Sequence, residues 1–401
     1  MKTDPAATRD RATARHRISQ PAAGQRDSRP GSSSLEGGAD DLAAVPAPPT
    51  PAQAGRRSGV AAACHGNRGT RASASRSGQS GAIRPPSAGP AIATHGIEAE
   101  LIAVLVAVTD GEPRVLTIRQ GCLLPSGPFE TAHRSLQAGL RAWVERQTSH
   151  PLGYVEQLYT FADRDRSDDD TGRRMVSISY LGLTRQARTS DQHDAAWRNW
   201  YRYFPWEDWR DSAPPSVIAR IIVPRLKAWM AAADDPALRR ERQQRARIAF
   251  GLNGLPWNEE LVLQRYELLF EAGLVPEAIR RHGGDESEAL PGEPMLHDHR
   301  RILATGIARL RAKIKYRPVV FELMPESFTL LQLQRVVEAL AGQRLHKQNF
   351  RRLVDQQALV EETGGVMTET GGRPAKLFRF RPQVLVERAV AGTKLPLARS
   401  G

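Results

Sequence analysis

The chain has 401 residues, with 57 Lys and Arg against 44 Asp and Glu, a formal net charge of +13. This length allows two or three domains. No apolar run approaches the roughly 20 residues that a membrane span needs, and the N-terminus lacks the apolar core of a secretory signal. The two cysteines, Cys64 and Cys122, argue against a disulfide framework. We therefore expect a cytoplasmic protein with no membrane partner.

The positive charge is concentrated at the two ends of the chain. Residues 1–95 contain 13 Lys and Arg against 6 Asp and Glu, and residues 298–401 contain 19 against 9. The middle, residues 96–297, carries a net charge of −4. A strongly basic C-terminal segment predicts a polyanionic partner, and nucleic acid is the simplest candidate. The slightly acidic middle is not expected to hold DNA.

Residues 1–95 are rich in Arg, Ala, Ser, Gly and Pro and contain no aromatic residue. Such a segment cannot bury enough apolar surface to offset the entropy lost on ordering, so we predict a disordered basic extension. It could add weak, salt-sensitive DNA affinity or be a dispensable extension. An organellar transit peptide is a third interpretation, which its acidic residues disfavour.

The first strand signal begins at Ile97. Residues 101–108 are nearly all apolar, which is typical of a buried strand. A turn at 110–113, a second strand at 115–118, a glycine loop and a helix over about 131–147 follow. This order resembles a Nudix domain.

The Nudix signature begins with a glycine and places an arginine and several metal-binding glutamates at fixed spacing. Aligned from Gly127, its arginine falls on Arg141 and one of its paired glutamates on Glu145. The positions of the other glutamates and of the closing glycine hold different residues: His133, Ala142, Arg146 and Thr148. The framework of the signature is present, but most of its carboxylates are not.

In active members of the Nudix family, these carboxylates hold magnesium ions that polarise a pyrophosphate and activate water. One carboxylate beside an Arg and a His cannot hold a hard divalent cation, even with help from Glu130. We therefore expect no metal site, no catalytic residue and no required cofactor. The pocket would instead bind a nucleotide as a sensor. The alternatives are a Nudix hydrolase of ADP-ribose or a related dinucleotide with an accessory DNA-binding domain, and an adaptor with a vestigial pocket.

A hairpin is predicted next, from residues 157–161 and 173–180, and a helical insertion over about 189–297 follows it. The insertion opens with a run of aromatic and arginine residues over 197–210. This run could stack an adenine ring, form a subunit contact or make a local core. Helices are expected at about 216–233, 236–251 and 257–272. The histidines in and after the insertion are expected to be surface or capping residues: His282, His297 and His299.

A helix over 300–314 is expected to bury Ile302, Leu303, Ile307 and Leu310 and to expose basic side chains. The predicted outward residues are Arg301, Arg309, Arg311 and Lys313. Pro318 is expected to start the first helix of the following domain.

Residues 328–356 have the pattern of a helix-turn-helix. Thr329 and Gln332 form a capping box, and Gly342 is placed to end that helix. A second helix over about 347–356 should bury Phe350, Leu353 and Val354. Its other face carries the groups that suit base edges and phosphates: Lys347, Gln348, Asn349, Arg351 and Arg352.

Two strands, 359–362 and 375–381, should follow as the wing, with Arg373 and Lys376 flanking its tip and meeting phosphates. The alternative for the basic helix is a solvated surface helix of an ordinary domain.

The Nudix-like part and the winged helix together resemble the Nudix-related transcriptional regulators of NAD metabolism. The motifs at 158–161, 176–180, 346–352 and 372–376 carry the resemblance, which covers roughly 96–188 and 298–382. The aromatic run also resembles that of a subgroup with such an insertion. The resemblance implies a bacterial repressor that binds operators near NAD biosynthesis genes and senses an NAD-derived nucleotide, typically ADP-ribose. Four residues are nominated for the effector, with the arginines on phosphates: Arg119, Arg141, Arg174 and Tyr180.

The predicted fold is an α/β Nudix-like sandwich at 96–317 with the helical insertion, followed by a winged helix at 318–385 and a flexible tail at 386–401. The predicted partners are a double-stranded DNA operator and a nucleotide effector. A homodimer is expected because one winged helix contacts one half-site, and paired half-sites multiply affinity.

Overall fold

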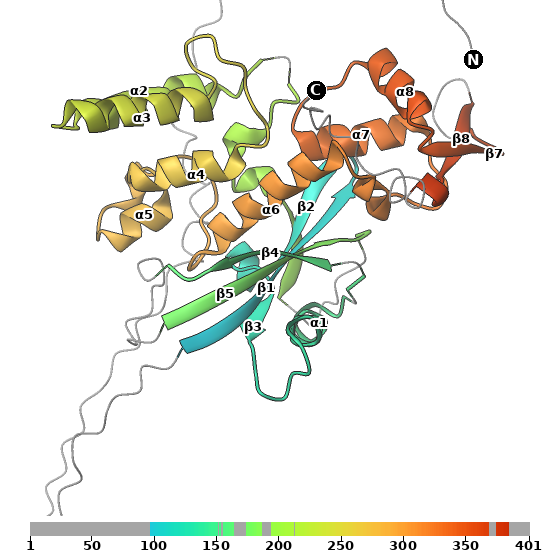
Figure 1. The fold of residues 1–401 in the computed structure, drawn as a ribbon, viewed down its shortest axis with the longest axis horizontal. Coiled ribbons are helices and arrows are strands. Elements are labelled where there is room, and N and C mark those ends of the chain that lie inside the picture. Colours follow the sequence, from blue (N-terminus) through green and yellow to red (C-terminus); the bar gives the residue numbers. More distant parts are fainter. Residues whose placement is uncertain are drawn as a thin grey trace, which may run out of the picture. The chain divides into compact units, whose positions relative to one another are not determined.

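The computed structural model describes residues 97–150, 152–153, 155–163, 174–186, 194–211, 213–368 and 374–384 (Figure 1). The segments predicted as a disordered extension and a flexible tail lie outside these residues, and so does Arg373. None of the described helices is long and apolar enough to cross a membrane.

A mixed sheet forms the centre of the Nudix-like domain (Figure 1), in the order β4-β5-β1-β2-β6, with β3 also paired to β1. β1 and β5 are parallel, and the other pairs are antiparallel. The strands are β1 Ile97–Thr109, β2 Glu112–Ile118, β3 Ser126–Pro128, β4 Val155–Phe161, β5 Arg174–Leu183 and β6 Ala195–Asn199. β1 is nearly all apolar because helices cover both faces of the sheet at this strand.

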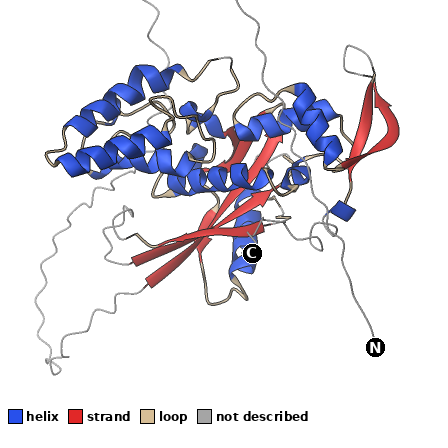
Figure 2. Cartoon of the chain, turned by 45° about the horizontal axis from the view of Figure 1, so that its top comes forward, coloured by secondary structure: helices blue, strands red, loops and turns tan. Residues whose placement is uncertain are grey.

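Helices cover the two faces of the sheet. Figures 1 and 2 show α1, Leu136–Thr148, on one side and α6, His299–Ile314, on the other. α6 approaches β1 closely at Gly306, where an added Cβ would lie 2.8 Å from the Val104 side chain. α1 begins later than predicted because Ser135 caps it, accepting a hydrogen bond from the Ala138 amide at 3.1 Å.

The insertion begins with a strand and continues as helices. β6 was not predicted, and it pairs with β2 at the edge of the sheet. A π-helical turn, Ile218–Ile222, leads into α2 Val223–Ala231, followed by α3 Pro236–Ala249, α4 Val262–Glu271 and α5 Pro276–Arg281. Four large side chains of the aromatic run are fully buried: Trp200, Tyr203, Phe204 and Trp206. Of the three interpretations of this run, the local core is confirmed.

The winged helix contains a 3-10 helix Val319–Leu323, α7 Leu330–Ala341, α8 Lys347–Gln356, β7 Val360–Met367 and β8 Ala375–Phe380. The predicted capping box is present. The Thr329 hydroxyl accepts from the Gln332 amide at 3.2 Å, and the Gln332 side chain accepts from the Thr329 amide at 2.7 Å. Gly342 ends α7 with a φ of 76°. The predicted architecture, an α/β domain with a helical insertion followed by a winged helix, is confirmed.

The predicted exposure of four side chains is wrong. Arg311 and Lys313 point inward, because carboxylates distant in sequence pair with them. His299 is buried, since its ring accepts a hydrogen bond from the Leu124 amide. Leu353 is 53% exposed, because it lies at the rim of a hollow of about 260 Å³ between α6, α7 and α8 instead of filling the core.

Candidate nucleic-acid interface and effector domain

α8 presents a polar, positively charged face to solvent. The side chains predicted for DNA recognition are all exposed on this helix: Lys347, Gln348, Asn349, Arg351 and Arg352. The opposite side of the helix packs through Val354, which is 4% exposed, and through Phe350. Within the described residues, no ion pair occupies the charged groups of Lys347, Arg351 or Arg352. These groups are therefore available to a polyanion.

The turn between α7 and α8 is held by a buried carboxylate that sequence reasoning missed. Glu338 accepts hydrogen bonds from the Leu345 amide at 2.9 Å and from the Gln334 side chain at 2.8 Å. Arg344 pairs with its second oxygen at 3.2 Å. Burial alone would raise the pKa of Glu338, but these three donors outweigh it and lower the pKa. The ionised carboxylate thus fixes the start of α8.

The wing is attached to the segment just before α7 and carries charge pairs across its strands. Phe328 and Phe378 exchange two backbone hydrogen bonds, at 2.9 and 2.8 Å. Lys376, nominated for DNA contact, binds the Glu362 carboxylate at 2.8 Å, and Arg379 binds Glu361 at 2.6 Å. All four side chains are exposed, so these pairs can exchange for phosphates. The role of Lys376 stays a prediction.

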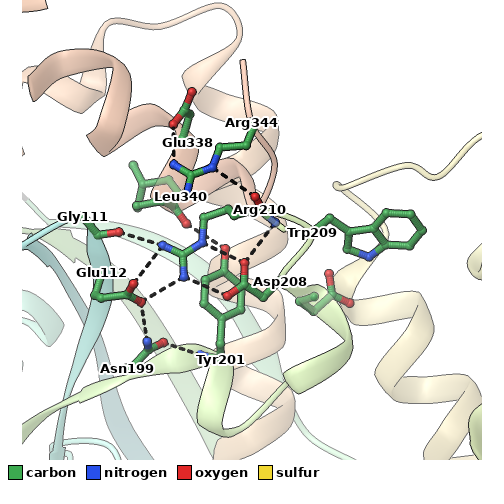
Figure 3. A network of polar contacts seen from close by, with 12 residues as sticks. Gly111, Glu112, Asn199, Tyr201, Asp208, Trp209, Arg210, Glu338, Leu340 and Arg344 are labelled. Carbon is green, nitrogen blue, oxygen red and sulfur yellow. Dashed lines mark hydrogen bonds and ion pairs between the residues drawn. The ribbon is translucent and has the colours of Figure 1, made fainter. Parts of the chain in front are cut away.

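A polar network joins the sheet to the turn of the helix-turn-helix (Figure 3). Arg210 binds the Gly111 carbonyl at 2.7 Å and the carboxylates of Glu112 and Asp208 at 3.0 and 2.7 Å. These hydrogen bonds, that of Asp208 first, raise the pKa of Arg210. Arg344 in turn donates to the Arg210 carbonyl at 3.0 Å. The aromatic run therefore connects the β1–β2 turn to the turn that precedes α8.

The aromatic run also contacts the end of α7, through a backbone amide and a side-chain hydroxyl. The Trp209 amide donates to the Gly342 carbonyl at 2.6 Å, and the Tyr201 hydroxyl donates to the Ala339 carbonyl at 2.7 Å. At Gly342 an added Cβ would lie 2.5 Å from the Glu207 carbonyl oxygen. Glycine is thus required there both by its left-handed backbone and by this close approach.

Glu207 lies at the centre of a buried charge cluster between the insertion, α6 and the winged helix. Its carboxylate binds Arg265 of α4 at 2.5 Å and Arg311 of α6 at 2.7 Å. Arg311 also donates to the Leu340 carbonyl at 2.9 Å. All three charged side chains are at most 1% exposed. No local pattern in the sequence indicated this cluster, because its members come from three separate segments.

The four residues nominated for the effector occupy different parts of the domain. Arg119 is exposed in a left-handed turn after β2, with a φ of 49°. Arg141 donates to the carbonyls of Leu152 and Gly153, the latter at 2.8 Å. Tyr180 is buried under α1, where burial raises its pKa. The side chain of Arg174, the first residue of β5, lies outside the described atoms. No contact among the described atoms joins the four, and their role stays a prediction.

A hollow of about 210 Å³ lies on the face of the sheet that α6 covers. It is lined by residues of β1, β4, β5 and the start of α6, including Glu100, Ser177, Asp298 and His299. The Nδ1 atom of His299 accepts a hydrogen bond from the Leu124 amide at 3.0 Å, so Nε2 carries the proton of the neutral ring. Nε2 is buried with no hydrogen-bond partner among the described atoms.

The protonation of His299 links stability to pH. Burial first, and then the charge of His297, lower its pKa from 6.5 to about 3. Between pH 3 and 6.5 this histidine is protonated in the unfolded chain but neutral in the folded one. The free energy of unfolding therefore falls as pH decreases below 6.5, by at most about 1.4 kcal/mol per pH unit. The variant His299→Asn keeps an acceptor for the Leu124 amide but does not titrate. Urea unfolding at several pH values should give a flatter dependence for the variant. Parallel curves would contradict this assignment.

Two residues at positions of the Nudix signature, His133 and Glu145, differ in their surroundings. The His133 ring lies 5.9 Å from the Phe129 ring and accepts from the Glu130 amide at 3.0 Å. Glu145 is exposed on α1. Among the described residues, no group of three or more His, Cys, Asp or Glu side chains could hold a metal ion.

Residues 320–380 match the NrtR DNA-binding winged helix domain family. A curated protein from Acinetobacter baylyi, the ADPR responsive transcriptional repressor NtrR, is 41% identical over 86 residues. That match covers 21% of this chain and 34% of the relative, so the chain matches about a third of the length of that protein.

Two solved structures are also similar to the chain. Shewanella oneidensis NrtR complexed with a 27mer DNA is 22% identical, with a TM-score of 0.43, over 72% of this chain and 95% of that one. A MutT/nudix family protein from Enterococcus faecalis is 14% identical, with a TM-score of 0.41, over 75% of this chain and 90% of that one. The strands and helices of this chain define its fold, and the family match assigns its C-terminal domain. The chain therefore carries an NrtR-type winged helix after an α/β domain built on a mixed sheet.

Proposed function

We propose that the chain is a transcriptional repressor of genes for NAD biosynthesis and metabolism, which senses an NAD-derived nucleotide such as ADP-ribose. The observation that carries this proposal is the exposed amide and guanidinium face of α8, inside a segment that matches the NrtR winged helix family. The ADP-ribose response in the name of the Acinetobacter baylyi relative supports the choice of effector.

The recognition helix would enter the major groove with its exposed face. Gln348, Asn349, Arg351 and Arg352 present the donors and acceptors that suit base edges and phosphates. Lys347, Arg373 and Lys376 would contact the DNA backbone, which positions the protein without reading sequence. Because one winged helix covers one half-site, the proposed assembly is a homodimer on double-stranded operator DNA in the cytoplasm.

The hollow beside α6 is the proposed place for part of the effector. Three carboxylates line it, those of Glu100, Asp163 and Asp298, and their oxygens can accept hydrogen bonds from ribose hydroxyls, although Arg301 already binds the last two. The Nε2–H group of His299 has no hydrogen-bond partner among the described atoms. Arg174 begins the strand whose Met175 and Ser177 line the hollow, and it remains the proposed phosphate ligand together with Arg119. Arg141 donates to two backbone carbonyls and Tyr180 packs in an apolar cluster, which supports a structural role for both.

The proposed regulator does not hydrolyse its nucleotide. Only Glu145 remains of the magnesium-binding glutamates, and Arg141 and His133 contact backbone groups nearby. Incubation with ADP-ribose and magnesium should release no AMP, while calorimetric titration should show binding. Robust turnover that Glu145→Gln abolishes would make the chain an enzyme. Absence of both turnover and binding would leave an adaptor with a vestigial pocket.

A gel-shift titration of the DNA upstream of its own gene tests the regulator directly. The full-length chain should shift this DNA specifically, and one of ADP-ribose, NAD and related nucleotides should change the shift. If no candidate operator is shifted while a nucleotide is slowly hydrolysed, the basic face of α8 is an ordinary surface and the proposal fails.

A further inference from the structure

A second positively charged surface lies in the insertion, far along the chain from α8. α2 and α3 pack side by side (Figure 1), and a groove of about 690 Å³ runs along them. Its lining includes Lys227, Arg240, Gln243, Gln244 and Arg247 and no carboxylate. The groove is therefore positively charged, although residues 96–297 as a whole carry a slightly negative net charge.

The spacing of α3 places these groups in one row. Arg240, Gln243, Gln244 and Arg247 are separated by three, four and seven positions, so they share one face of the helix. All four side chains are exposed, as is Lys227 on α2. Like charges on one helix face repel each other, and a bound polyanion would relieve this repulsion.

The neighbouring arginines of α3 have different surroundings. Arg242 lies over the Trp229 ring, 4.2 Å from its centroid, and donates to the Trp229 carbonyl at 3.1 Å. Arg245 binds Glu271 at 2.5 Å, and Arg239 donates to the Ala233 carbonyl at 2.7 Å. These three hold the insertion together. Within the described residues, no carboxylate pairs with Lys227, Arg240 or Arg247.

We propose that the α2–α3 groove binds the phosphate backbone of the DNA that flanks the sequence held by α8. The proposal rests on the DNA-binding function proposed above and extends it to a second contact surface. Ammonium, guanidinium and amide groups donate to phosphate oxygens, and the absence of a lining carboxylate favours an anionic partner. The apolar walls formed by Met230, Ile248 and Leu252 can pack against deoxyribose. Contacts of this kind add affinity without base specificity.

The test compares two DNA lengths with the full-length chain. A core duplex of about 20 base pairs covers two half-sites one helical turn apart, and a longer duplex adds about one turn of DNA on each side. The core sequence is selected from a random library by the chain itself. The variant Lys227→Gln/Arg240→Gln/Arg247→Gln should bind the core duplex like the wild type. It should bind the longer duplex at least about fivefold more weakly. The slope of its log affinity against log salt concentration should be smaller in magnitude by about 2 to 3.

Two control variants separate charge from folding. Arg220→Gln removes an exposed arginine of the π-helical turn that does not line the groove, and it should leave both affinities unchanged. Lys227→Arg/Arg240→Lys/Arg247→Lys preserves the charge and should retain binding to the longer duplex. Equal binding of the longer duplex by the wild type and the glutamine variant, with core binding intact, would overturn the groove proposal alone. Failure of the wild type to bind the core duplex would overturn the winged-helix function and this proposal with it.

Discussion

Replacing Arg351 and Arg352 by alanine is expected to abolish operator binding without unfolding the chain. Both side chains are exposed on α8 and have no ion-pair partner among the described residues. Loss of one base contact costs about 1–3 kcal/mol. Two such losses amount to about 2–6 kcal/mol, which is a fall in affinity of at least about thirtyfold.

The measurement is a gel-shift titration of the double variant, with its thermal unfolding recorded in parallel. The unfolding midpoint should stay near that of the wild type, because substitutions at exposed positions usually change stability by less than about 0.5 kcal/mol. Arg309→Ala is the matched control, since it removes an exposed arginine of α6. Full operator affinity in the Arg351→Ala/Arg352→Ala variant would refute the assignment of α8 as the recognition helix.

Neutralising Glu207 is expected to cause the largest loss of stability. Its carboxylate binds Arg265 and Arg311 in a cluster that is at most 1% exposed. The variant Glu207→Gln keeps the shape of the side chain but leaves two buried guanidinium groups without a counter-charge. Breaking a buried pair by changing one partner costs about 3–5 kcal/mol. This is a large part of a total stability of about 5–15 kcal/mol.

Urea unfolding of Glu207→Gln and Glu112→Gln compares the loss of a buried ion pair with the loss of an exposed one. Both glutamates bind an arginine, but Glu112 is 38% exposed and its pair with Arg210 is accessible to water. The second variant should therefore lose about 1 kcal/mol or less. Because Arg311 also holds the Leu340 carbonyl at the end of α7, Glu207→Gln should weaken operator binding under conditions where it remains folded. Similar stability losses in the two variants would contradict the role of Glu207.

The winged helix could be predicted from sequence because its signals are local. The capping box of Thr329 and Gln332, the left-handed Gly342 and the basic face of the next helix all lie within 28 residues of chain. The observed α8, Lys347–Gln356, agrees with the predicted range. Such elements are specified by hydrogen bonds between near neighbours and by helical spacing.

The buried charges could not be predicted, because their partners are distant in sequence. Arg311 and Glu207 are 104 residues apart, and helical spacing alone assigned Arg311 to solvent. His299 was likewise expected at the surface, although its ring accepts from an amide 175 residues away. Periodicity shows which face of a helix is apolar, but it does not show where a charged side chain meets its partner.

The edge strand β6 was missed for a different reason. It is five residues long and contains two alanines, so its alternation is weak. The aromatic run that follows was recognised as unusual, and the local core was one of three open interpretations. The structure adds that this run contacts both the β1–β2 turn and the end of α7. The proposed effector site depends on side chains from several strands, and the sequence does not show which of them lie together.

A nucleotide-responsive repressor requires coupling between nucleotide binding and DNA binding. The direct measurement is the dissociation constant of the full-length chain for its operator over a series of ADP-ribose concentrations. A coupling of about 1–3 kcal/mol would change operator affinity about 5- to 150-fold, and DNA should change the affinity for ADP-ribose by the same factor. An operator affinity that stays constant while calorimetry shows bound ADP-ribose would contradict the proposal that this chain is a nucleotide-responsive repressor.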